Sequence, residues 1–278
     1  MTTQNILALA IVLALAPLAA AESPSQRGYH LFNPVPKDKL RPLSADRPDA
    51  TESPQTVDAG HIQLEMDVAL YLRDRARFVE DTYAYGATNF KLGLTHNVDL
   101  QLIWAPHVTT KTRSSGFTER IDGFSNLTIR SKINLWGNDG DTKTSFALLP
   151  FINIPLGSGS VGNDDAQGGI VLPFGMDLPN GWGLGAQLGV EIVRNDADDG
   201  YRVDFSQTIV LGHDIVGDLA GFVEFLSVAP AEGDWFGTVD VGLTYAVNDN
   251  VQLDVATFIG VNSAAPDFVV FTGITWRF

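Results

Sequence analysis

The C-terminal stretch of the chain alternates between apolar residues and others, and it stops on an aromatic residue. Its apolar members at even-numbered positions are Phe268, Val270, Ile274, Trp276 and Phe278. A period of two is the spacing of a β-strand, because successive side chains of a strand point to opposite faces. A chain that ends on such a strand is typical of an outer-membrane β-barrel, and Trp276 and Phe278 are the candidate insertion signal.

The same alternation starts the strand-rich part of the chain. Between positions 62 and 72 the apolar residues are Ile62, Leu64, Met66, Val68, Leu70 and Leu72, and the residues between them include Gln63, Glu65, Asp67, Tyr71 and Arg73. A shift of one residue would place these charges in hydrocarbon, where a cation near the midplane costs roughly 2–4 kcal/mol. We therefore expect the apolar set to face lipid and the polar set to face the lumen.

Repeated alternation predicts twelve antiparallel strands that form a transmembrane up-and-down β-barrel. The expected strands cover 60–73, 84–95, 98–110, 123–136, 144–154, 169–178, 182–194, 201–212, 219–229, 235–246, 251–262 and 268–278. An even strand number suits a single-chain bacterial barrel, and tight turns alternate with longer connections such as 74–83 and 111–122. This asymmetry predicts a cell outer-membrane location with both termini in the periplasm.

A secreted β-sandwich is the alternative fold, because its strands also alternate. Sandwich strands average roughly 5–6 residues, however, whereas a strand that crosses a hydrocarbon band of about 25 Å needs about 9–11. Aromatic residues also fall near the expected strand ends, as interfacial girdles require: Trp182, Tyr245 and Trp276 on the periplasmic side, and Tyr201 and Trp235 on the outer side. The barrel is therefore favoured.

Composition and charge indicate the domain boundaries and exclude some classes of partner. Residues 1–21 contain an apolar core followed by three alanines and are interpreted as a secretory signal peptide, 22–59 as a periplasmic or lumen-plugging segment, and 60–278 as the barrel. The net charge of -15 disfavours nucleic acid as a partner. The chain has 0 cysteines, which leaves no thiolate chemistry.

The 22–59 segment is rich in proline, which disfavours helices and strand ladders. It is either a disordered tether or a plug. In the plug hypothesis residues 41–59 fold into the periplasmic half of the pore, and Arg47 pairs with Glu65, Asp67 or Asp254. The residues expected to plug or gate the pore are Asp46, Arg47, Pro48, Asp49, Thr51, Glu52, Ser53 and Pro54.

The same residues carry a family resemblance. Arg47-Pro48-Asp49, Thr51-Glu52-Ser53-Pro54, Thr56-Val57 and Gly60-His61 follow one another directly before the first alternating strand. This order resembles the opening signature of an outer-membrane transporter family of the meta-pathway of phenol degradation, although Asp58 stands where the family has proline. The resemblance implies an outer-membrane channel for small apolar or aromatic compounds.

Inside a twelve-stranded barrel the lumen is expected to be narrow, since eight strands are filled by side chains and sixteen leave an open channel. Eleven charged residues are expected to line it: Glu65, Asp67, Lys91, Arg130, Lys132, Glu191, Arg202, Asp204, Glu224, Asp240 and Asp254. They either pair as a structural ladder or tune selectivity. Inward-facing Phe222, Phe258 and Phe271 suggest an apolar passage or simple lumen packing.

These observations favour passive or facilitated uptake of small hydrophobic or aromatic solutes, with outer-membrane lipids and the barrel-assembly machinery as partners. The alternatives are a structural barrel without a transport role and a lipid-modifying hydrolase. No histidine falls on the oily face beside a serine, so no enzyme is expected. Neither a cofactor nor a metal is expected, because the acidic loop 195–200 does not match a calcium-binding EF-hand.

Overall fold

One antiparallel sheet closes on itself to form a barrel. The computed structural model describes residues 28–76, 78–158, 161–162, 164–195 and 200–278; the expected signal peptide and most of the 195–200 loop lie outside these residues. The described strands are β1 (Ile62–Asp74), β2 (Val79–Tyr85), β3 (Ala87–Thr95), β4 (Val98–Trp104), β5 (His107–Ser114), β6 (Phe117–Gly123), β7 (Leu127–Trp136), β8 (Thr144–Ile154), β9 (Gln167–Asp177), β10 (Trp182–Asn195), β11 (Gly200–Val216), β12 (Leu219–Pro230), β13 (Phe236–Asn248), β14 (Val251–Gly260) and β15 (Phe268–Arg277). Two short 3-10 turns, η1 (Lys37–Lys39) and η3 (Pro179–Gly181), complete the elements. No described helix is long and apolar enough to cross a membrane.

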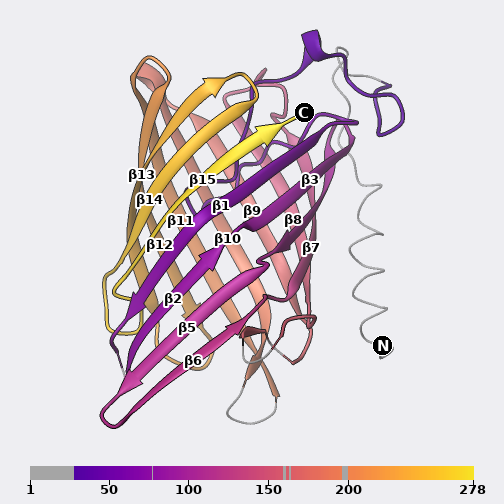
Figure 1. Ribbon diagram of the computed structural model, residues 1–278. Helices are drawn as coiled ribbons and strands as arrows, with labels where there is room; N and C mark the ends of the chain where they lie inside the picture. The colour runs from indigo at the N-terminus through magenta and orange to yellow at the C-terminus, as the bar shows by residue number, and fades with distance from the viewer. Residues whose placement is uncertain (1–27, 77, 159–160, 163, 196–199) are drawn as a thin grey trace.

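The prediction of twelve strands is confirmed. The structure closes a ring because β15 pairs with β1, and β2–β3, β4–β5 and β6–β7 are each two halves of one strand (Figure 1). The first of these breaks lies at Gly86, whose φ is +68, a left-handed conformation that suits glycine. The second lies at Pro106, which has no N–H to donate to a ladder.

The closing seam is the β1–β15 pair. Gln63 pairs with Arg277 and Arg73 with Phe268, so the two strands match along their length apart from one register shift between Asp67 and Ala69. At the end of the seam, Phe278 donates its N–H to the carbonyl of Ile62 at 3.0 Å. We call this end of the barrel, with Phe278 and the β3–β4 and β13–β14 turns, the C-terminal rim, and the opposite end the distal rim.

The register shift reverses the side-chain faces of the distal part of β1, and here the simple alternation was wrong. Before the shift, Glu65 and Asp67 face the lumen as expected. Beyond it, Leu70 pairs with Phe271 of the inner face, whereas Tyr71 packs on outward-facing Phe268 with ring centroids 5.7 Å apart. Leu70 and Leu72 therefore face inward, and Tyr71 and Arg73 face outward, because the extra residue of a β-bulge shifts the two-residue period by one.

The distal halves of three further strands share this reversal, since their registers continue row by row from β1. Arg73 pairs with Asp81 in β2, Asp81 with Lys111 in β5, and Lys111 with Arg120 in β6. The breaks at Gly86, at Ala105-Pro106 and at 124–126 thus lie in one line across the wall, and beyond it the outward face is polar.

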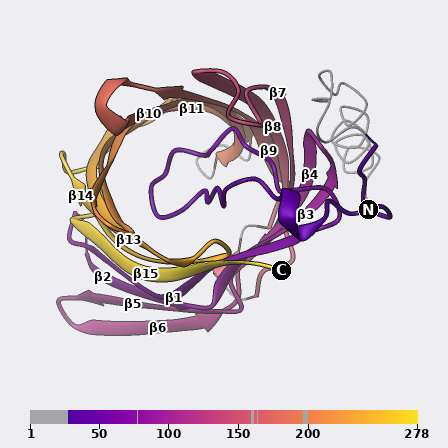
Figure 2. The same cartoon turned by 90° about the horizontal axis from the view of Figure 1, so that it is seen from above.

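The same region does not form the long loops expected at 74–83 and 111–122. Most of these residues extend the sheet as β2, β5 and β6, and β6 pairs with β5 alone. The β5–β6 hairpin projects at the distal rim, on the outside of the ring (Figures 1 and 2). Alternation is weak here because the residues are polar on one face and mixed on the other.

Candidate functional site: the luminal segment and the inner wall

Residues 41–58, which we call the luminal segment, lie inside the ring of strands (Figure 2). The segment has no regular secondary structure between Arg41 and Asp46, as its prolines led us to expect. Its backbone hydrogen bonds go instead to inward-facing side chains: Val57 N–H donates to Asp99 at 3.0 Å and Glu52 N–H to Gln187 at 2.8 Å. The wall therefore supplies partners that the segment cannot supply itself.

Asp46 is the centre of the largest group of charges. Its carboxylate lies 2.5 Å from Lys91 Nζ, 2.6 Å from Lys132 Nζ and 3.6 Å from Arg130. Glu65 also contacts Lys91 and accepts the N–H of Asp46 at 3.1 Å. Burial raises the pKa of Asp46, but the three cations outweigh it and hold that pKa well below its usual value.

Arg47 points to the opposite side of the lumen. Its guanidinium lies 2.6 Å from Asp67 and 2.8 Å from Asp254, and 5.5 Å from the ring centroid of Phe271. Asp67 and Asp254 were two of its three expected partners; the third, Glu65, binds Lys91 instead. The adjacent residues Asp46 and Arg47 therefore bind different parts of the wall: Asp46 contacts β3 and β7, and Arg47 contacts β1 and β14.

The tip of the segment reaches β7, β11 and β12. Glu52 forms a two-pronged ion pair with Arg130, and Thr51 shares a 2.6 Å hydrogen bond with Thr208. Ala50 N–H donates to Glu224 at 2.8 Å. Contacts to several strands fix the tip more firmly than contacts to a single strand would.

Asp49 stands at this tip without an ion pair among the described residues. Burial, with a further contribution from the nearby Glu224 carboxylate, raises its pKa well above the usual value. The tip is therefore the part of the luminal segment that is sensitive to pH.

The remaining expected plug residues lie within the segment. Ser53 N–H donates to Asp46 at 3.0 Å, Pro48 is buried, and the carbonyl of buried Pro54 accepts from Asn134 at 3.0 Å. Alternation in the sequence does not reveal Asn134, Gln187 and Asp99 as partners, because it indicates the face on which a residue lies but not its neighbour on another segment.

A second anchor, near the C-terminal rim, was not predicted. Arg41 and Arg277 both bind Asp58, at 2.8 Å and 3.3 Å. Asp58 is the position at which the chain departs from the proline of the family pattern. An aspartate here ties the start of the luminal segment to the last residues of the barrel.

The other charges expected in the lumen all lie on its wall, but they do not form one ladder. Arg202 pairs with Asp204 at 2.9 Å within β11, and Glu191 lies opposite Asp204 in register. Glu224 and Asp240 face each other across β12 and β13, and both are buried. Acidic groups thus accumulate on the β10–β13 side, whereas the cations Lys91, Arg130 and Lys132 lie on the β3–β7 side.

Aromatic side chains line the wall on the β12–β15 side. The rings of Phe258 and Phe271 meet edge to face with centroids 5.2 Å apart. The ring of Phe222 lies over Gly242, where a Cβ would come within 2.4 Å of it. Glycine at 242 therefore allows this ring to lie flat against the inner wall, and inward-facing Leu70 adds to the same apolar side.

Cavities flank the luminal segment at several places. One of about 510 Å³ lies at the C-terminal rim between Leu40–Leu43 and the β13–β14 turn, one of about 260 Å³ lies between the tip and β8–β11, and one of about 240 Å³ lies between the two ends of the segment and the β7–β8 turn. The segment therefore fills only part of the lumen.

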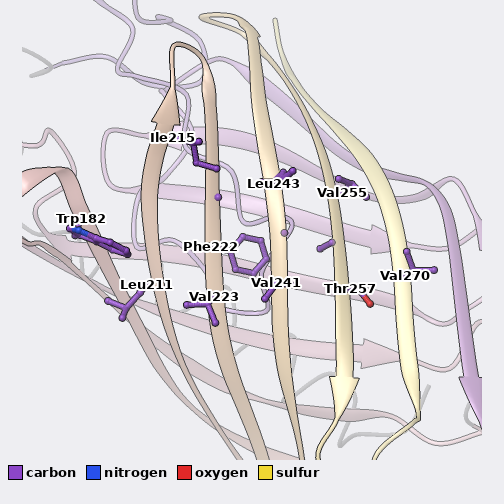
Figure 3. A pocket seen from close by; sticks show the side chains of 13 residues that line it. Trp182, Leu211, Ile215, Phe222, Val223, Val241, Leu243, Val255, Thr257 and Val270 are labelled. Atoms are coloured by element: carbon purple, nitrogen blue, oxygen red, sulfur yellow. The ribbon is translucent and has the colours of Figure 1, made fainter.

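A further groove of about 620 Å³ lies on β11–β15 beside Trp182 of β10 (Figure 3). Most of its lining residues, among them Leu211, Val223, Leu243 and Val255, belong to the outward-facing set. It is a depression in the lipid-facing wall beside Gly221, outside the luminal route.

Comparison with known proteins places this architecture. No curated protein matches the chain. Among solved structures, the COG4313 outer membrane channel from Pseudomonas putida F1 matches with a TM-score of 0.65 at 12% identity, over 84% of this chain and 100% of that one. The beta domain of the Bordetella autotransporter Brka matches with a TM-score of 0.51 at 10% identity, over 78% and 98%. Both likenesses show the fold of an outer-membrane barrel.

The family comparison covers most of the luminal segment and the whole barrel. The model of the family described as "Putative MetA-pathway of phenol degradation" matches residues 45–278. The chain belongs to this family.

Proposed function

We propose that the protein is an outer-membrane channel for small hydrophobic or aromatic compounds, with the C-terminal rim in the periplasm and the luminal segment as its gate. The observation that carries this proposal is a lumen that the segment fills in part and whose wall includes an apolar stretch. Polar contacts anchor the segment to β3 and β7 and, through Arg47 and the tip, to β1, β11, β12 and β14. Phe222, Phe258 and Phe271 form the apolar stretch on the β12–β15 side. The family description, which refers to phenol degradation, and the channel named in the P. putida structure support it.

The chemistry of the apolar stretch fits such a solute. An aromatic ring passing along Phe258 and Phe271 would gain edge-to-face contacts, and the Arg47 guanidinium beside Phe271 would attract the face of a second ring. A hydrophilic solute gains neither contact. Aromatic compounds are therefore the first to test.

Gating is tested by deleting 41–56 and recording single-channel conductance in planar bilayers. We expect a conductance several times that of the complete chain, because the segment fills part of the lumen. The matched control is Lys37→Gln/Lys39→Gln, which changes exposed residues of η1 outside the segment. An unchanged conductance after the deletion would remove the gate from the proposal.

Transport is tested separately with proteoliposomes and a panel of aromatic acids, fatty acids and sugars. Uptake that favours the aromatic acids, and that falls when Phe258 and Phe271 are both replaced by serine, supports the proposal. A flat response across the panel would favour a structural barrel. Assays of the same preparation for acyl hydrolysis test the enzymatic alternative.

A further inference from the structure

The reversed part of the wall carries a row of cations on its outer face. Arg73, Lys111 and Arg120 lie in one register row across β1, β5 and β6. Arg113 lies on the same face, two residues closer to the distal rim than Lys111. The side chains of Arg113 and Arg120 are 49% and 58% exposed. On the apolar wall of β10–β15, most of the exposed outward positions are Leu, Ile, Val and Phe, and the outward cation Arg194 at its distal end pairs with Asp165.

This basic face begins where the apolar band of the same strands ends. Tyr85, Trp104 and Phe124 are exposed aromatic residues at the line of breaks, and Trp104 packs edge to face on Phe124 with centroids 6.1 Å apart. Exposed aromatic residues at this height mark the boundary between hydrocarbon and headgroups. The cations therefore lie at the level of the headgroups of the leaflet at the distal rim.

The charges of the face do not cancel. Asp81 is shared by Arg73 and Arg113, and Asp122 is held by both nitrogens of the Arg120 fork at 2.8 Å. Lys111 has no carboxylate partner among the described contacts; its ammonium lies 5.3 Å from the ring centroid of Tyr83. Four cations against two carboxylates give a positive patch on a chain whose net charge is -15. A local cluster of positive groups attracts anions, because the potential close to the cluster is positive even on a chain that is acidic as a whole.

We infer that this face, with Arg73, Lys111, Arg113 and Arg120 as its cations, binds the phosphate groups of the glycolipid that forms the outer leaflet of the outer membrane. The inference rests on the orientation proposed above, in which the distal rim faces outward. Arginine forks and a lysine at headgroup level match phosphate in charge and hydrogen-bond geometry. The acyl chains of the same lipid would lie below, against the apolar wall at Trp104 and Phe124.

The orientation is checked first, because the chain has no cysteine of its own. A single Ser115→Cys variant places a thiol in the β5–β6 turn, and a membrane-impermeant maleimide should label it on intact cells. Labelling only after lysis would overturn both the proposed orientation and the phosphate site, but would leave the channel untouched.

Binding is then measured on the purified full-length protein in detergent, with bisphosphorylated lipid A and dephosphorylated lipid A as probes. We expect the wild-type protein to prefer the bisphosphorylated form, and Lys111→Gln/Arg113→Gln to lose about five- to thirtyfold in affinity for it, as the removal of two exposed charge contacts implies. The control Lys37→Gln/Lys39→Gln removes the same charge near the C-terminal rim and should change nothing. Equal affinity for the two lipids, or equal loss in the control, would overturn the inference, and heat-modifiable migration shows that each variant is folded.

Discussion

At the scale of single residues, Asp46 holds the luminal segment in place because three cations converge on it. Replacing Asp46 with asparagine keeps the shape but leaves Lys91, Lys132 and Arg130 with less opposing charge in a buried site. Removing one partner of a buried ion pair costs about 3–5 kcal/mol. We therefore expect D46N to release the segment and to raise the open fraction in planar bilayers.

The control for this variant is Asp38→Asn, which neutralises an exposed carboxylate in η1. It should leave the open fraction at the wild-type value. If D46N and D38N behave alike, the buried charges do not hold the segment.

Asp49 makes the stability of the seated luminal segment depend on pH. Its pKa is raised in the seated state, mainly by burial, so the seated segment prefers the protonated carboxyl. That contribution is present below the usual aspartate pKa and is lost as pH rises toward the raised value. The open fraction should therefore increase as pH rises above about 4, the usual aspartate value, and Asp49→Asn should flatten this rise.

Asp46 sets the lowest pH at which that experiment reports on Asp49, because protonation of Asp46 also weakens the seated segment. Its lowered pKa contributes stability above the usual value, and the contribution is lost only as pH falls below it. A pH profile that is identical in the wild type and D49N would exclude Asp49 as the titrating group.

At the scale of elements, the bulge at Val68 decides which faces of β1 meet lipid. Inserting one alanine after Val68, in a strand that keeps its one-residue bulge, would turn Leu70 and Leu72 outward and place Tyr71 and Arg73 in the lumen, away from Asp81. Deleting Val68 keeps Leu70 inward, because it removes the extra residue and leaves the alternation beyond it in place. We expect the insertion to lower the folded, heat-modifiable fraction in membranes far more than the deletion does.

Comparable loss in the two variants would show that the length of β1 matters and the face of its side chains does not. The insertion is especially costly because β2, β5 and β6 depend on the register of β1: Arg73 pairs with Asp81, and the same row continues through Lys111 to Arg120.

At the scale of the whole molecule, closure of the ring depends on Phe278. Its backbone bonds Ile62 in both directions, at 3.0 and 3.3 Å, and its ring packs on Trp276 with centroids 4.7 Å apart. Deleting Phe278 removes both contributions, whereas Phe278→Ala removes only the ring. The folded fraction in the outer membrane should fall in the order wild type, F278A, deletion.

Equal yields of F278A and the deletion would assign the effect to the aromatic side chain as an insertion signal. Equal yields of F278A and the wild type would assign it to the backbone seam. Either outcome separates the two roles that the sequence combines in one residue.

Much of the barrel was predictable because alternation is a local property. From Thr144 to Phe278 the expected strands differ from the structure by a few residues at each end, and Glu191, Asp240 and Asp254 face inward as expected. A run of two-residue periods long enough to cross a membrane contains this information without reference to any neighbour.

The sequence by itself therefore determined the fold class, the number of strands and the face of most side chains. Only the tertiary structure decided that the faces reverse beyond Val68, Gly86 and Pro106, that Asp46 lies among Lys91, Lys132 and Arg130, and that Asp58 joins Arg41 to Arg277. The reason is physical: a bulge is defined by the register with the adjacent strand, and an ion pair by the meeting of segments distant in sequence. Neither is encoded in the period of a single strand.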